Sequence, residues 1–131
     1  LGSGNSSYGN LQFKLIRDGL TNVRIAVLEN APYVADVAMP WEWLDGKRPN
    51  TIYVHPLLLV LGDHAQNDLF GDEEDSVINE LADYGYEVKP IHSALGEYEA
   101  IQDIFRQHVQ DCIDDLYGKR STYRPTIPNI K

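Results

Sequence analysis

The segment 97–117 constrains the fold of this chain more than any other part of the sequence, because its apolar residues recur at the spacing of one helix face. They lie three or four positions apart and comprise Tyr98, Ile101, Phe105, Val109, Cys112 and Leu116. This periodicity predicts a long amphipathic helix that packs by one face on a core, and Gly118 is predicted to end it. We expect Cys112, which lies on the stripe, to be a small buried side chain. His108 flanks the stripe and is expected to be structural.

The N-terminal half of the chain shows shorter patterns. Apolar residues in 11–20 are spaced as in a short helix that ends near Gly19. The alternation of β-branched residues in 23–28 predicts a strand with one buried face. A second short strand is our interpretation of 33–39. It would pair as a hairpin with a strand predicted at 51–54, across an intervening turn that contains Asp-Gly.

The apolar run that follows residue 54 has two interpretations. Pro56 suits the first turn of a helix, where its missing N–H is harmless, whereas proline rarely sits inside a central strand. The residues that then form one stripe, four positions apart, are Leu57, Leu61, Ala65 and Leu69. We therefore predict a helix over 56–70. The alternative is that the strand at 51–54 continues through the run.

Two further elements precede the long helix. A helical pattern with apolar residues at Val77, Ile78 and Leu81 is predicted to end at Gly85. Its N-terminus is rich in acids, and either Asp72 or Asp75 is expected to cap it. The segment 86–92 alternates as a strand does, and its Pro90 indicates an edge position or a strand end.

The order of these elements predicts an α+β or mixed α/β fold. We expect a single domain at 11–118, in which helices pack on a small mixed sheet of about three to four strands. Residues 1–10 are interpreted as a flexible polar lead, and 119–131 as a basic tail that contains proline. The sequence shows no signal peptide and no transmembrane segment, and it has one cysteine, so we expect a cytoplasmic or other reducing compartment.

Charge is distributed unevenly along the chain. The net charge of −9 combines a neutral segment 1–62, a segment 63–115 with 15 acids and two bases, and a segment 116–131 with four bases and no acid. The acidic middle would repel a nucleic acid, because phosphate binding needs lysine or arginine to replace counterions. Nucleic-acid binding is therefore not expected, and an acidic surface favours basic partners or cations.

One dipeptide, Asp63-His64, is the strongest candidate for catalysis. An aspartate beside a histidine can bind a metal or transfer protons, but on a helix the two side chains point about 100° apart on its polar side. The four histidines are too far apart in sequence for a helical metal motif. No cofactor is predicted. A loosely held divalent cation remains an alternative, with these weak candidate ligands: Asp68, Asp72, Glu73 and Asp75.

Binding surfaces are indicated at two places. Trp41 and Trp43 lie two positions apart beside the turn, and tryptophan is enriched where proteins bind one another. Tyr123 and Arg124 lie in the basic tail, whose composition suits an arm that docks on a neighbour. The predicted partner is a protein with basic character or a second copy of the chain, and no membrane is expected.

Two functions from different classes fit these patterns. The first is a non-catalytic protein–protein interaction or assembly module with an acidic surface and a basic C-terminal arm, such as an adaptor, a virion component or an inhibitor of a basic partner. This hypothesis leans against an enzyme, because no known catalytic motif is found. The alternative is a small hydrolase or metal-dependent enzyme with a site centred on Asp63 and His64.

Overall fold

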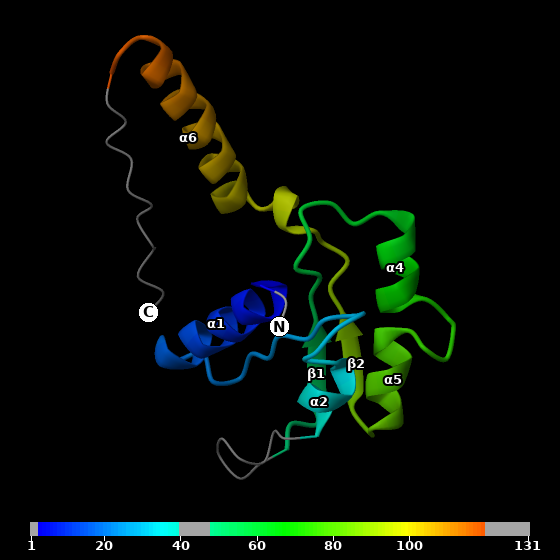
Figure 1. The fold of residues 1–131 in the computed structure, drawn as a ribbon. Helices are drawn as coiled ribbons and strands as arrows, with labels where there is room; N and C mark the ends of the chain where they lie inside the picture. The colour runs from blue at the N-terminus through cyan, green and yellow to red at the C-terminus, as the bar shows by residue number, and fades with distance from the viewer. Residues whose placement is uncertain (1–2, 40–47, 120–131) are drawn as a thin grey trace. The chain divides into compact units, whose positions relative to one another are not determined.

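The computed structural model describes residues 3–39 and 48–119, and it divides the chain into two compact units. The first unit contains residues 1–54 and 62–91, and the second contains residues 55–61 and 92–131. Figure 1 labels the helices and strands of both units.

A two-stranded parallel sheet forms the centre of the first unit. Strand β1 (Thr51–Val54) pairs with strand β2 (Glu87–Pro90) in a register that sets Thr51 opposite Glu87. Parallel strands need a long crossover, and the chain between them supplies the helices α4 (Asp63–Phe70) and α5 (Val77–Asp83). The predictions of strands at 51–54 and 86–92 are confirmed, and Pro90 ends its strand as expected.

The core of this unit lies where helices α2 (Val34–Ala38) and α5 pack beside β2 (Figure 1). Its buried members are Val34, Ala38, Val77, Leu81 and Tyr86. The Tyr86 hydroxyl donates a hydrogen bond to the Ala38 carbonyl, so the polar end of a buried aromatic ring is paired. The guanidinium of Arg48 lies 4.2 Å from the centre of the Tyr86 ring.

The segment 23–28 is not a strand, which corrects the sequence-based prediction. Helix α1 (Ser3–Arg17) places Gln12 beside it. The Gln12 amide nitrogen donates to the Val23 carbonyl at 2.9 Å, and its amide oxygen accepts from the Ile25 N–H at 2.7 Å. A side chain therefore supplies the partners that a neighbouring strand would have supplied. The helix predicted at 11–20 also begins earlier, at Ser3, within the region interpreted as a polar lead.

The segment 33–39 is a helix rather than a strand, so the predicted hairpin with β1 is wrong. Helix α2 buries Val34 and Ala38, which lie four positions apart, and Asp36 between them is exposed. The Asp36 carboxylate accepts from the Tyr33 N–H at 2.9 Å and so caps the first turn. The sheet consequently has two strands in the described residues, fewer than expected.

The helix predicted at 56–70 begins only at Asp63, and β1 does not continue through the run. Residues 55–62 form a loop instead. The carbonyl of Leu58 accepts from the Leu95 N–H at 2.7 Å, and that of Leu59 accepts from the Gly96 N–H at 3.0 Å. These backbone groups are therefore bonded to a distant segment and cannot also form helical turns.

Helix α5 begins at Val77, after the acidic residues that were expected to cap it. Ser76, not Asp72 or Asp75, is its N-cap residue, and the Ser76 carbonyl accepts from the Glu80 N–H at 2.9 Å. The acids form a loop whose carbonyls at Gly71 and Glu73 accept from the Asn79 side chain. The predicted end is confirmed, because Gly85 follows the helix with φ of +91°, a conformation that favours glycine.

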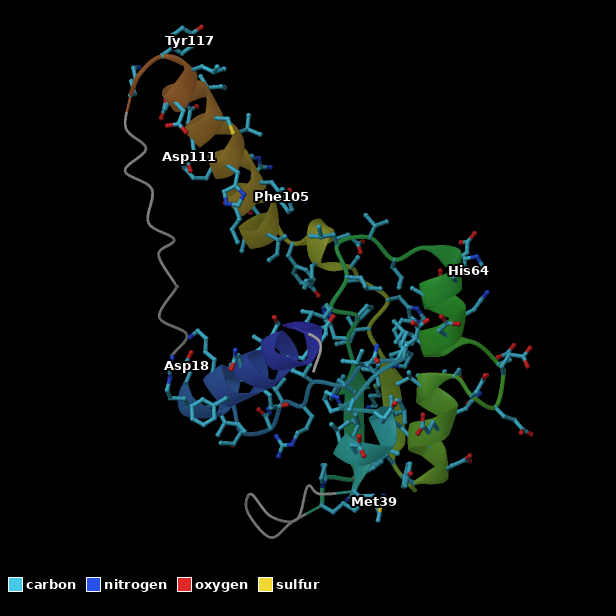
Figure 2. The ribbon with its side chains drawn as sticks, viewed as in Figure 1. Asp18, Met39, His64, Phe105, Asp111 and Tyr117 are labelled. Atoms are coloured by element: carbon cyan, nitrogen blue, oxygen red, sulfur yellow. The ribbon has the colours of Figure 1, made fainter. Side chains whose placement is uncertain are left out.

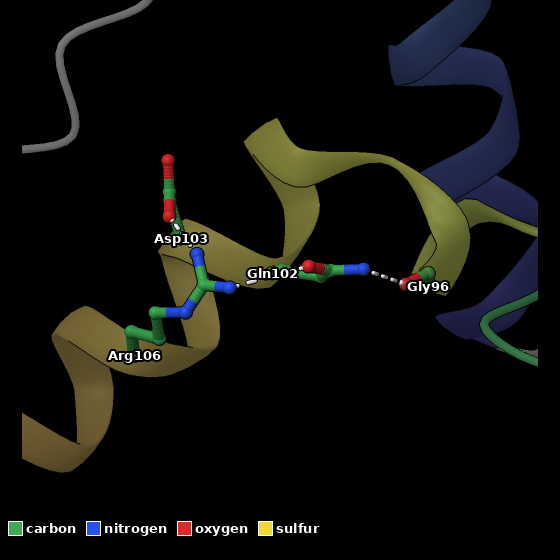
Figure 3. Close-up of polar contacts among 4 residues, drawn as sticks. All are labelled: Gly96, Gln102, Asp103 and Arg106. Carbon is green, nitrogen blue, oxygen red and sulfur yellow. Dashed lines mark hydrogen bonds and ion pairs between the residues drawn. The ribbon is translucent and has the colours of Figure 1, made fainter.

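The second unit is built from a short 3-10 helix, η1 (Leu95–Glu97), and helix α6 (Glu99–Leu116). Figure 3 shows how they are joined: the Gln102 side chain donates to the Gly96 carbonyl at 2.9 Å and accepts from Arg106, which also pairs with Asp103. The prediction of a long helix at 97–117 is confirmed. Gly118 has φ of +70° and ends it as expected.

Helix α6 buries none of its residues, against the expectation that its apolar face packs on a core. Cys112 is a free, exposed cysteine, so the prediction of a buried side chain is wrong. His108 is also exposed, and its ring and that of Phe105 lie in a T-shaped arrangement. The fold class is nevertheless confirmed as mixed α/β, with a small sheet and a long C-terminal helix.

The close approach at Gly96 gives the first testable prediction. A Cβ at this position would lie 2.6 Å from the Leu59 carbonyl oxygen, the atom that its own N–H contacts. We expect Gly96→Ala to destabilise the loop by about 1–3 kcal/mol. Hydrogen exchange should show faster exchange at the Leu95 and Gly96 amides. Gly9→Ala is the matched control, because no atom lies within 4 Å of a Cβ there; equal exchange in both variants would contradict the prediction.

Candidate functional site

The dipeptide Asp63-His64 opens helix α4. Gly62, in an extended conformation, precedes it, and the Gly62 carbonyl accepts from the Gln66 N–H at 2.9 Å to close the first turn. Both side chains are exposed, and Figure 2 shows His64 projecting from the surface of α4. An aspartate in the first turn suits the positive end of the helix dipole. An accessible imidazole can give its free nitrogen to a metal ion or accept a proton.

A second feature of the first unit is an acidic pocket, by which we mean the cavity lined by Leu28, Glu29, Asn67, Asp68, Glu73 and Asp75. Its volume is about 250 Å³, and four of its six lining residues carry carboxylates. Helix α4 supplies Asn67 and Asp68, and the loop before α5 supplies Glu73 and Asp75. Asn79 holds that loop by its hydrogen bonds to two loop carbonyls. The pocket can attract a cation, since its lining has one sign of charge.

Only some of the weak candidate metal ligands line the acidic pocket. Asp68, Glu73 and Asp75 line the acidic pocket, whereas Asp72 is exposed and does not line it. Within residues 3–39 and 48–119, no group of three or more histidine, cysteine, aspartate or glutamate side chains is placed to hold a metal ion. The described residues thus offer single donors and an acidic surface rather than a closed coordination shell.

The second unit contains an ordered histidine at the carboxyl end of β1. The Nδ1 atom of His55 lies 2.8 Å from the Pro56 carbonyl, which can only accept, so Nδ1 carries the proton. In the neutral ring the Nε2 atom then accepts from the Tyr98 hydroxyl at 2.9 Å. Sequence reasoning did not find this pair, because its members are 43 positions apart. The only signal was a histidine directly after a strand, where ligands often bind in α/β sheets.

The remaining candidate residues are His92 and the predicted partner-binding residues. His92 follows the end of β2 and is exposed. The predicted partner-binding residues Trp41, Trp43, Tyr123 and Arg124 lie outside the described residues. None of the helices in the described part of the chain is both long enough and apolar enough to cross a membrane.

Comparison with known proteins matches the chain to a protein family and to a curated relative. A family model described as "Cobalt chelatase (CbiK)" matches residues 2–114. A protein named sirohydrochlorin cobaltochelatase, from Salmonella typhimurium strain LT2, is 32% identical over 91 residues. The match covers 70% of this chain and 33% of that protein, so the chain spans about a third of the length of the curated relative it matches.

Both matches are described as chelatases, and chelatases are enzymes. The hypothesis of a non-catalytic interaction or assembly module is therefore wrong, and so is its lean against an enzyme. The alternative, a metal-dependent enzyme, agrees better with the matches. Motif spacing within the chain did not indicate this, because its carboxylates and histidines match no motif with a fixed spacing.

Proposed function

Because the chain belongs to the cobalt chelatase (CbiK) family, we propose that it contributes the metal-transfer site of an enzyme that inserts Co²⁺ into sirohydrochlorin. Both the metal ion and the tetrapyrrole are substrates here. The observation that carries the proposal is the family match over residues 2–114, which includes Asp63-His64 at the exposed start of α4.

The reaction needs a metal donor and a proton acceptor. A divalent cobalt ion enters the macrocycle as two pyrrole N–H protons leave, so charge is balanced when a base removes the protons. A neutral His64 imidazole can perform either task, by holding the incoming ion through one nitrogen or by accepting a pyrrole proton. Asp63, the adjacent carboxylate, would favour the positive charge that builds up on His64 or on the metal.

The exposure of the dipeptide also suits this reaction. A metal ion that is delivered to a substrate must be held weakly enough to leave, and a closed shell of four ligands would retain it. An open pair on a helix surface leaves coordination positions free for the pyrrole nitrogens. The described residues hold no closed shell, and this arrangement supports delivery of the ion rather than storage.

The acidic pocket would raise the local concentration of Co²⁺ near α4. Its four carboxylates are Glu29, Asp68, Glu73 and Asp75, and α4 itself supplies Asp68. Electrostatic attraction of this kind speeds association and weakens with salt. In this proposal the pocket gathers the ion and the dipeptide transfers it.

The test is an absorbance assay of cobalt insertion. The full chain is incubated with sirohydrochlorin and Co²⁺, alone and together with the part of the Salmonella relative that lies outside its matched segment. We expect the spectrum of the macrocycle to shift faster than in buffer in at least one of these mixtures. The proposal is refuted if circular dichroism shows a folded chain and cobalt is inserted no faster than in buffer in either mixture.

Neutralising the acidic pocket gives a second prediction. In the double variant Glu73→Gln/Asp75→Asn, we expect the Co²⁺ concentration for half-maximal rate to rise about three- to tenfold at low salt, with little change in the maximal rate. The difference should shrink at high ionic strength. Asp83→Asn, which removes an exposed carboxylate outside the pocket, is the control and should leave the cobalt dependence unchanged. A salt-independent loss of maximal rate would argue against this role.

A further inference from the structure

The second carboxylate of helix α4, Asp68, lies at the end of the helix where a negative charge is disfavoured. Asp68 belongs to the last turn of α4, and this turn contains no basic residue. The carbonyl groups at this end form the negative pole of the helix dipole, which destabilises an acidic side chain beside it. Aspartate is also among the poorer helix formers. Asp68 therefore lowers the stability of the helix that carries it.

The neighbours of Asp68 add to this cost. The lining of the acidic pocket contains no lysine or arginine, and its other charged members are Glu29, Glu73 and Asp75. In the part of the chain that the structure describes, none of the salt bridges involves Asp68. A residue that is unfavourable both by its position and by its neighbours is typical of a functional site, where local rules are broken for the sake of activity.

Asp68 shares a helix face with His64. The two residues lie four positions apart in α4, so their side chains are neighbours on successive turns, with Cβ atoms about 5–6 Å apart. Asp63, by contrast, is adjacent to His64 and points about 100° away around the helix axis. The same spacing of four allows two donors on one helix to hold one metal ion in the HExxH motif. Asp68 is therefore the carboxylate of α4 that is spaced to bind one ion together with the imidazole.

We propose that Asp68 is a metal ligand of the transfer site, which receives the Co²⁺ ion in the acidic pocket and shares it with His64. This inference rests on the proposed function, since it takes Co²⁺ as the metal substrate. Because Asp68 lines the pocket and lies on the same face of α4 as His64, it joins the place where the ion gathers to the residue that delivers it.

The chemistry of this step is a ligand exchange. A carboxylate oxygen of Asp68 and the unprotonated nitrogen of a neutral His64 each displace one water molecule of the hydrated ion, and no proton is released. The charge of the ion also offsets the repulsion among the carboxylates of the pocket. With two protein donors, the remaining coordination positions stay open for the pyrrole nitrogens.

The test uses the full chain and Co²⁺ alone, without the macrocycle. We expect Asp68→Asn to raise the dissociation constant for Co²⁺, measured by calorimetry, about tenfold or more. This loss should persist at high ionic strength because a ligand is removed, whereas the effect of Glu73→Gln/Asp75→Asn should shrink there. In the absence of metal, Asp68→Asn should raise the melting temperature by about 1–4 °C, because it removes a charge from the negative end of the helix.

Asp72→Asn is the matched control, because Asp72 is exposed and lies outside both α4 and the pocket. It should leave the dissociation constant for Co²⁺ unchanged. Combining Asp68→Asn with His64→Ala should weaken binding by less than the product of the two single effects, since both residues hold the same ion.

Four results would overturn the role of Asp68: Co²⁺ binding by Asp68→Asn as tight as in the unchanged chain, an effect that disappears with salt, single effects that multiply, or a lower melting temperature of Asp68→Asn, which would indicate a structural role. Weaker Co²⁺ binding by Asp68→Asn, without cobalt insertion by the unchanged chain, would count against the proposed function only. Cobalt insertion with the same Co²⁺ dependence in Asp68→Asn and in the unchanged chain would count against the role of Asp68 only.

Discussion

Replacing His64 with alanine is expected to lower the rate of cobalt insertion by about 10²- to 10⁴-fold, the range that a positioned acid–base group contributes. His64 lies in the first turn of α4, exposed beside Asp63, and the proposed reaction uses its free nitrogen for the metal or the proton. The loss should appear in the maximal rate, measured by the absorbance change of the macrocycle at saturating Co²⁺. Added imidazole should restore part of the rate, because it replaces the missing base.

The matched control is Gln66→Ala, on the same helix. Gln66 is exposed and two positions away, so its side chain points to another side of α4. This variant should insert cobalt at the rate of the unchanged protein. If both variants lose activity equally, the effect comes from the helix and not from the imidazole, and the role assigned to His64 fails.

Leu81→Ala is expected to have the largest effect on stability, a loss of about 2–5 kcal/mol in the free energy of unfolding. Leu81 is 5% exposed and belongs to the core cluster in which α2 and α5 pack beside β2. Removing its three terminal carbons leaves a cavity that the surrounding side chains fill only in part. A domain of this size has about 5–15 kcal/mol in total, so unfolding by urea should begin at clearly lower concentration.

Leu116→Ala makes the same chemical change at a leucine that is 83% exposed. We expect it to alter the free energy of unfolding by less than about 0.5 kcal/mol. Circular dichroism during urea titration measures both variants. Similar losses in the two would mean that the cluster around Leu81 is not the core of the first unit.

The helices that could be predicted best from the sequence are those whose signals are local, and the two strands were predicted from their own apolar alternation without their pairing. The spacing along α6 and the glycines after α5 and α6 describe each helix without reference to the rest of the chain. The wrong predictions concern segments whose hydrogen-bond partners are distant in the sequence. The segment 23–28 is held by the side chain of Gln12, and the loop 55–62 is held by backbone N–H groups of Leu95 and Gly96. A sequence pattern cannot show which distant group will form hydrogen bonds with the backbone N–H and carbonyl groups of a segment.

The candidate site, too, could be predicted from the sequence only in part. Asp63-His64 was recognised from the sequence as an adjacent pair of the right chemical types, and its role stays a prediction. The hydrogen bond between His55 and Tyr98 was not foreseen, because it depends on how the loop after β1 approaches the start of α6. The acidic pocket was foreseen only as a loose cation site with weak candidate ligands at Asp68, Asp72, Glu73 and Asp75. Glu29 joins it from a segment about 40 positions earlier, which only tertiary structure can show.

The interleaved course of the chain has a consequence for anyone who divides this protein. The second unit takes residues 55–61 from between two parts of the first, and the chain passes from one unit to the other three times, after Val54, Leu61 and Ile91. A truncation after Ile91 would therefore not remove one unit cleanly. It would leave the carbonyls of Leu58 and Leu59 without the amides that they accept from. Each compact unit is formed by two separate segments of the chain. The ends of a shortened protein should therefore be chosen from the contacts between segments and not from position along the sequence alone.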